Sequence, residues 1–175
     1  RPAAPARREG VDAGALAAFL KAESDATDVA EAIARRLGLA LPEIEVADFR
    51  ANGYAPEAIV NFLALLGWNP GMKTEDGKDL EKFDAAFLAR HFAIDRVGRT
   101  NARFDRAKLL SFNGDRLSAL PDEEFAARWL AHLRAYEPGA LARLAPEGSP
   151  DARERIMLLA RAVKPRARTL RDALK

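Results

Sequence analysis

The spacing of apolar residues predicts helices along nearly the whole chain. Val29, Ile33 and Leu37 recur every fourth position, and Phe62 and Leu66 repeat that spacing, which places each set on one face of a helix. No stretch alternates apolar and polar residues with β-branched enrichment, as a half-buried strand would. We therefore predict an all-α fold. The expected helices cover residues 12–23, 27–37, 46–52, 56–66, 79–83, 84–92, 105–112, 121–133 and 150–163.

Capping residues and helix breakers support these boundaries. Asp12 and Asp105 stand where an N-cap is expected. Pro121 precedes three acids, a pattern typical of a helix start. Residues 69–77 carry Pro and Gly and predict a loop. Thr169, with an acid three residues later, predicts one more helix start near the end of the chain.

The aromatic residues are expected to serve packing. Tyr54 is expected to pack against Trp68, and Asn61 and Asn113 to cap or bridge backbone groups. The predicted core aromatics are Phe62, Trp68, Phe83, Phe87 and Phe104.

The composition is that of an ordinary globular protein, with 49% apolar and 31% charged residues among 175. Cysteine is absent, which excludes disulfides, thiolate metal sites and cysteine nucleophiles and fits a reducing compartment. The longest apolar run, residues 58–68, is shorter than the roughly 20 residues that span a bilayer. We expect a cytoplasmic chain without membrane contact. Because it begins with Arg rather than Met, we also expect an excerpt or a processed product.

The charge is unevenly distributed although the net charge is only +2. Eight acids face three basic residues between positions 12 and 48, whereas six basic residues face one acid between 161 and 175. Residues 96–116 also lean basic. Such asymmetry is typical of a surface that meets a polyanion, although a solvated helix face explains it as well.

No self-contained active site is recognisable. His91 and His132 lack a metal-ligand partner at helical spacing and are expected to be packing or surface residues. No glycine-rich phosphate loop is present. The carboxylate pairs are explained as helix starts or solvated surface. We expect no catalytic residue and no metal site in this chain.

Three segments together carry a resemblance to a known family. Residues 53–68 read GYAPEAIVNFLALLGW. Residues 92–113 contain FAIDRV, NARFD and KLL before Asn113, and residues 164–170 read KPRARTL. In this order they resemble the bacterial-type glutamyl-tRNA synthetases over about residues 46–175, in the region that follows the catalytic domain.

The sequence departs from the family in ways that matter for catalysis. Ala55 replaces the usual leucine, a mild change. The His-x-Gly-His signature and the Lys-x-Ser-Lys loop that holds ATP are absent, and Met72-Lys73-Thr74 resembles the latter only superficially. Residues 12–41 have no match in the family. We therefore expect this chain alone to be inactive and to hold no cofactor, with ATP and magnesium acting in the parent ligase.

The resemblance implies a tRNA-binding fragment built as a helical bundle. It implies a stem-contact domain over residues 46–116 and the start of an anticodon-binding domain over 117–175. The acidic segment over residues 1–45 precedes them as a separate part that the resemblance does not cover. The implied partners are glutamate tRNA and the remaining catalytic and C-terminal domains of the parent, with no DNA. The candidate RNA contacts are Arg96, Arg99, Arg103, Arg106 and Lys108 near the stem, and Arg161, Lys164, Arg166, Arg168 and Arg171 nearer the anticodon.

Two other functions remain open. The chain could be a helical protein-interaction module that docks a partner through apolar and acidic faces, or a free-standing tRNA-binding protein without ligase activity. The salt dependence of binding distinguishes the protein-interaction module from a tRNA-binding protein, because affinity that comes from phosphate contacts falls steeply as the salt concentration rises. A catalytic domain encoded directly upstream would rule out the free-standing tRNA-binding protein.

Overall fold

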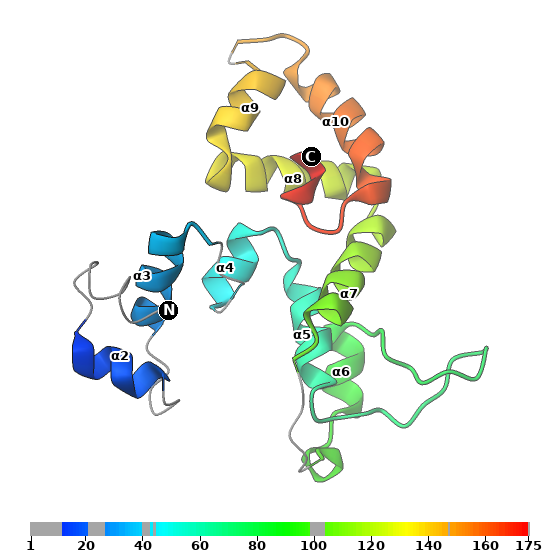
Figure 1. Ribbon diagram of the computed structural model, residues 1–175. Helices are drawn as coiled ribbons and strands as arrows, with labels where there is room; N and C mark the ends of the chain where they lie inside the picture. Colours follow the sequence, from blue (N-terminus) through cyan, green and yellow to red (C-terminus); the bar gives the residue numbers. More distant parts are fainter. Residues whose placement is uncertain are drawn as a thin grey trace. The chain divides into compact units, whose positions relative to one another are not determined.

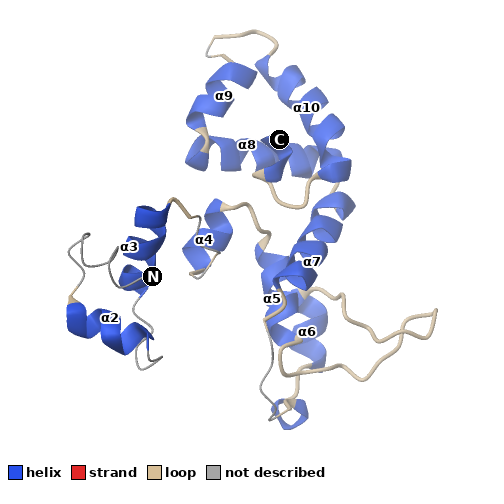
Figure 2. Ribbon diagram, viewed as in Figure 1, coloured by secondary structure: helices blue, strands red, loops and turns tan. Residues whose placement is uncertain are grey.

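A computed structural model describes residues 12–20, 27–39, 43, 45–98, 104–146 and 148–174. The chain divides into two compact units, residues 1–46 and 47–175. The described residues form helices joined by loops and turns, without a β-strand (Figure 2). The predicted all-α fold is confirmed. The predicted further division between residues 116 and 117 stays a prediction, and helix α7 runs across that point.

The first unit contains two short helices that pack on each other. Helices α2 (Ala13–Leu20) and α3 (Thr27–Leu37) bury Leu16 and Val29 in a small apolar cluster. The carboxylate of Asp12 accepts the backbone N–H of Ala15 at 2.9 Å and so caps α2 as predicted. The predicted end of this helix, at 23, lies outside the described residues.

The second unit contains the remaining helices, arranged as two packed groups along the chain (Figure 1). The first group consists of α4 (Val46–Ala51), α5 (Pro56–Ala64), α6 (Ala85–His91), the 3-10 turn η1 (Ile94–Arg96) and α7 (Arg106–Ala119). The second consists of α8 (Asp122–Tyr136), α9 (Pro138–Leu144), α10 (Ala152–Val163), and the 3-10 turns η2 (Lys164–Arg166) and η3 (Asp172–Leu174).

Each group has its own hydrophobic core, and α7 contributes to both. Leu109 and Phe112 of α7 pack in the first core with Phe49 and Phe62. One helical turn further on, Leu117 of α7 lies in the second core. That core is the larger one and includes Phe125, Trp129, Leu133, Ile156 and Ala160. Helix α5 contributes to both as well, with Ala58 in the second core and Phe62 in the first, so α5 and α7 together join the two cores.

The structure bears out some of the aromatic predictions and corrects two, the burial of Phe104 and the partner of Tyr54. Phe62 and Trp68 are buried, whereas Phe104 is 39% exposed and packs edge-on against Phe62. Tyr54 packs against Phe49, with ring centroids 5.3 Å apart, and not against Trp68 as expected. Two further aromatics, Phe83 and Phe87, are half-buried and stack on each other.

Two helix predictions are wrong for reasons that lie outside the local sequence. Residues 79–83 are not helical, because the buried Asn61 side chain holds this stretch by its backbone. Its amide donates to the carbonyl of Glu81 at 2.8 Å and accepts the N–H of Phe83 at 3.2 Å. Helix α7 does not end at Phe112 but continues to Ala119, because Leu117 is drawn into the second core.

The side chain of Asn113 ties three segments of the second unit together. It is fully buried on α7. Its carbonyl oxygen accepts the N–H of Ala55 before α5 at 2.7 Å, and its amide donates to the carbonyl of Arg168 after η2 at 2.5 Å. Both partners are backbone groups distant in sequence, which confirms the predicted bridging role for Asn61 and Asn113.

The turn at Gly53 completes this junction. The N–H of Leu170 donates to the carbonyl of Gly53 at 3.0 Å. Gly53 has φ +80°, and a Cβ there would lie 2.7 Å from the backbone nitrogen of Leu170. The position therefore requires glycine on two grounds, its backbone conformation and the close approach of the C-terminal segment.

Replacing Asn113 by alanine should destabilise the second unit by about 2–4 kcal/mol, because it leaves the Ala55 N–H and the Arg168 carbonyl buried without partners. Urea unfolding followed by tryptophan fluorescence measures this directly, since both tryptophans, Trp68 and Trp129, are buried in this unit. Asn69→Ala is the matched control. It removes only an exposed bond to the Gly71 N–H and should cost less than about 1 kcal/mol. Equal stability of the two variants would contradict the bridging role.

Candidate nucleic-acid interface

The ten predicted RNA-contacting cations fall into distinct structural situations. Arg99 and Arg103 lie outside the described residues. Four of the others form ion pairs within the chain, one holds a loop, one stacks on aromatic rings, and two point away from the protein without a carboxylate partner among the residues that the structure describes. All eight lie in the second unit.

The ion-paired cations join helices to one another. Lys108 pairs with Glu81 at 2.6 Å. Lys164 and Arg161, at the end of α10, both reach Asp122 at the start of α8, at 2.9 and 3.3 Å. These two contacts hold the pKa of Asp122 below its usual value, with the hydrogen bond from Lys164 as the main cause.

Arg171 is engaged as well. Its guanidinium lies 3.2 Å from the carboxylate of Glu137 and donates to the side-chain oxygen of Asn52 at 2.8 Å. It thus joins the C-terminal segment to α8 and to the turn after α4. An RNA phosphate would have to compete with these internal partners.

Arg96 and Arg106 make other internal contacts. The guanidinium of Arg96 donates to the carbonyl of Pro70 at 2.8 Å, which fixes the loop before it. That guanidinium also lies so close to Gly71 that a side chain there would clash. Arg106 lies over the rings of Phe104 and Phe49, at 5.5 and 6.0 Å from their centroids, as a cation–π contact does.

Arg166 and Arg168 are the two exposed cations of this set whose guanidinium groups have no ion pair, hydrogen bond or ring contact with the described parts of the chain. The segment that carries them is well anchored. Ala167 and Thr169 are buried on either side of Arg168, whose carbonyl accepts the Asn113 amide. The N–H of Asp172 donates to the Thr169 hydroxyl at 3.1 Å, as the predicted cap requires, although the 3-10 turn η3 follows in the described chain in place of an α-helix. Arg166, the last residue of η2, and Arg168, between the two buried residues, are both exposed to solvent.

A stronger ion pair lies outside the predicted set. Glu57, at the start of α5, accepts two hydrogen bonds from the guanidinium of Arg128 on α8, at 2.8 and 3.2 Å, and lies 3.5 Å from Arg116 on α7. The hydrogen bonds from Arg128, more than any other cause, lower the pKa of Glu57 to about 2. Glu57 belongs to the family-like string 53–68, but nothing in the local pattern indicates a partner 71 positions away.

The two histidines take part in packing. His132 is buried on α8 beside Tyr136, with ring centroids 5.1 Å apart, and burial lowers its pKa. His91 lies against Phe87 at 4.3 Å. Where the structure describes the chain, no three acidic or histidine side chains gather as a metal site would require. None of its described helices is long and apolar enough to cross a membrane.

Known proteins resemble this chain in both sequence and fold. The glutamate–tRNA ligase of Synechocystis sp. is 41% identical over 88 residues, half of this chain and 17% of the relative. That of Thermobifida fusca is 35% identical over 126 residues, which is 69% of this chain and 25% of the relative. No family model matches the chain.

The solved structures agree with this relationship. The glutamate–tRNA synthetase of Elizabethkingia anophelis superposes with a TM-score of 0.54 at 25% identity, over 82% of this chain and 27% of that protein. The chain thus spans between 17% and 27% of the length of these relatives. The resemblance noted in the sequence is confirmed.

Replacing Glu57 by glutamine should lower the free energy of unfolding at pH 7 by about 1 kcal/mol, a value that allows for solvent screening of this partly exposed pair. Glu57 has a lowered pKa in the folded state, so its contribution is present above about pH 4.5 and is lost as the pH falls toward 2. The stability difference between wild type and E57Q, measured by urea unfolding, should therefore shrink over that range. The control E75Q changes an exposed loop residue and should match wild type throughout. A pH-independent difference would show that the charge of Glu57 is not involved.

Proposed function

We propose that this chain, a homologue of part of the glutamate–tRNA ligases, is the C-terminal helical region of such a ligase and positions glutamate tRNA. The homology supports this proposal at the level of the family. The local support comes from Arg166 and Arg168, which stand on a firmly held segment, face solvent and have no carboxylate partner among the described residues.

The chemistry of these two arginines suits RNA. A-form RNA is recognised mainly through its phosphates and 2′-hydroxyls, and unstacked bases are often bound by arginine planes. A guanidinium without an internal partner keeps its donors available for either contact. The segment is held by the buried Asn113 junction, so its arginines are pre-positioned before RNA arrives, which reduces the ordering cost of binding.

On this proposal the chain works by binding rather than by chemistry. Any step that uses ATP and magnesium, and the attachment of glutamate itself, would take place in parts of the ligase that this chain does not match. We also predict a cytoplasmic location for the chain. Its predicted partners, besides tRNA, are the catalytic and C-terminal domains of the ligase. The paired cations, Lys108, Arg161, Lys164 and Arg171, would then serve mainly to hold the helices that present the RNA-facing segment.

A protein-interaction module is the alternative function, and exposed apolar side chains favour it. Ile94 is 83% exposed and Leu158 is 68% exposed, and both are large apolar side chains. Such residues suit a protein partner better than a polyanion. Binding through them would depend little on salt, which separates the two functions experimentally.

Reversing the charge of either arginine, by R166E or R168E, should weaken binding of unmodified glutamate tRNA about tenfold, because each removes a phosphate or base interaction. The plot of log affinity against log salt concentration should also become shallower by about 1 for each phosphate that the variant no longer neutralises. Titration of the whole chain at two salt concentrations, with an unrelated tRNA beside the cognate one, measures both effects.

The matched control is R90E, which reverses an exposed arginine on α6 whose one described bond is to a carbonyl of its own helix. It should bind as the wild type does. Binding that does not change with salt, or equally weakened binding by R90E and R168E, would contradict the proposal and favour the interaction module.

A further inference from the structure

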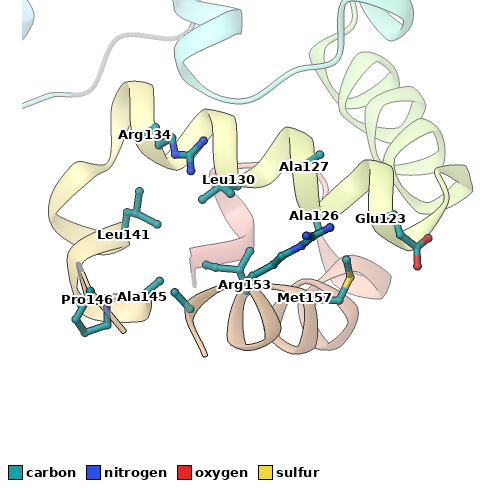
Figure 3. A pocket seen from close by; sticks show the side chains of 13 residues that line it. Glu123, Ala126, Ala127, Leu130, Arg134, Leu141, Ala145, Pro146, Arg153 and Met157 are labelled. Carbon is teal, nitrogen blue, oxygen red and sulfur yellow. The ribbon is translucent and has the colours of Figure 1, made fainter. Parts of the chain in front are cut away.

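The second core leaves an open pocket that the proposed RNA-binding segment does not use. The pocket lies between α8, α9 and α10 and has a volume of about 510 Å³ (Figure 3). Its wall is aliphatic, with Leu130, Leu141, Ile156 and Met157 among alanines. None of the residues of the C-terminal segment lines it. Pockets of about 300–1,000 Å³ with mostly apolar walls and a few polar groups are typical of small-molecule sites.

The polar groups of this pocket are mainly cationic. Arg134 of α8 and Arg153 of α10 line it, and in Figure 3 the guanidinium of Arg153 extends from α10 toward Ala126 of α8. Neither arginine has a carboxylate partner among the described residues. Among the described residues of the lining the one acid is Glu123, which lies 3.7 Å from Arg161 and is already engaged.

We propose that this pocket binds a small amphipathic anion, with an aliphatic body against the apolar wall and a carboxylate head held by Arg153. The unpartnered guanidinium of Arg153 accounts for the negative head, since a guanidinium binds a carboxylate in a bidentate, charge-assisted geometry. Arg134 lies farther along α8 and adds to the positive charge of the pocket. The aliphatic wall accounts for the body. The described residues of this wall include no aromatic side chain on which a nucleobase would stack, so a nucleotide suits this pocket less well than the RNA-facing segment does.

The composition of the chain provides a site-specific probe. It has only two methionines, Met72 and Met157. Met157 lines the pocket, whereas Met72 lies on the loop between α5 and α6. Carbon-13 labelling of the methionine methyl groups thus gives two NMR signals in the whole chain, one at the site and one as an internal reference, assigned with Met72→Leu.

The experiment titrates decanoate below its micelle concentration and follows both methyl signals. We expect a saturable shift of the Met157 signal with no change at Met72. Decanol, which lacks the negative head, should bind at least about tenfold more weakly, because it cannot form the charge-assisted hydrogen bonds. R153E should weaken decanoate binding by about tenfold or more and leave decanol binding unchanged, whereas R134E should weaken decanoate binding less.

The control R143E makes the same change of net charge on α9, at an exposed arginine outside the pocket lining, and should bind decanoate as the wild type does. An unmoved Met157 signal would overturn the proposal. So would decanol binding as tightly as decanoate, or equal effects of R143E and R153E. A Met157 shift with cytidine monophosphate but not with decanoate would show a nucleotide site instead. None of these outcomes depends on whether Arg166 and Arg168 bind tRNA.

Discussion

The buried amide of Asn113 is the interaction on which the second unit depends. The core between packed helices is normally apolar. A polar side chain buried there is tolerated only when all its polar groups are hydrogen-bonded. Here both ends of the amide find backbone partners, Ala55 before α5 and Arg168 after η2. These two segments and α7 come from three distant parts of the chain. Their register is therefore set by hydrogen bonds that only one arrangement satisfies, whereas apolar contacts alone would permit sliding.

The charged residues of this unit divide into those that build it and those that face solvent. Glu57, Asp122 and Glu137 each engage a cation that lies far away in sequence. Lys164 illustrates the consequence, because its side chain is only 15% exposed and its charge is satisfied inside the fold. A basic sequence segment is thus not equivalent to a basic surface. Of the basic cluster near the chain end, Arg166 and Arg168 contribute outward charge without an internal carboxylate among the described residues.

Much of the fold follows from local sequence signals. The N-caps Asp12 and Asp105 and the acidic start of α8 are short-range features, and all three stand where the pattern places them. The bridging of backbone groups by Asn61 and Asn113 was also predictable, because a buried asparagine needs partners. What local signals could not supply is the identity of those partners. The extended course of residues 79–83 depends on Asn61, some twenty positions earlier. The continuation of α7 depends on a core formed by later helices. The pairing of individual arginines depends on distances across the fold, so the sequence placed cations in the right region without showing which ones remain open.

Helix α7 also affects how the unfolding of one core is coupled to that of the other. It contributes to both cores, and Gly114 lies between its two buried stretches. Glycine is the weakest helix former among non-proline residues, so this is where the helix would fray if the cores separated. The Arg168 backbone packs against this glycine, with its Cα 3.6 Å from where a Cβ would stand, and supports the helix there. Loss of the C-terminal segment would therefore weaken the helix at this point, and with it one of the two helical links between the cores.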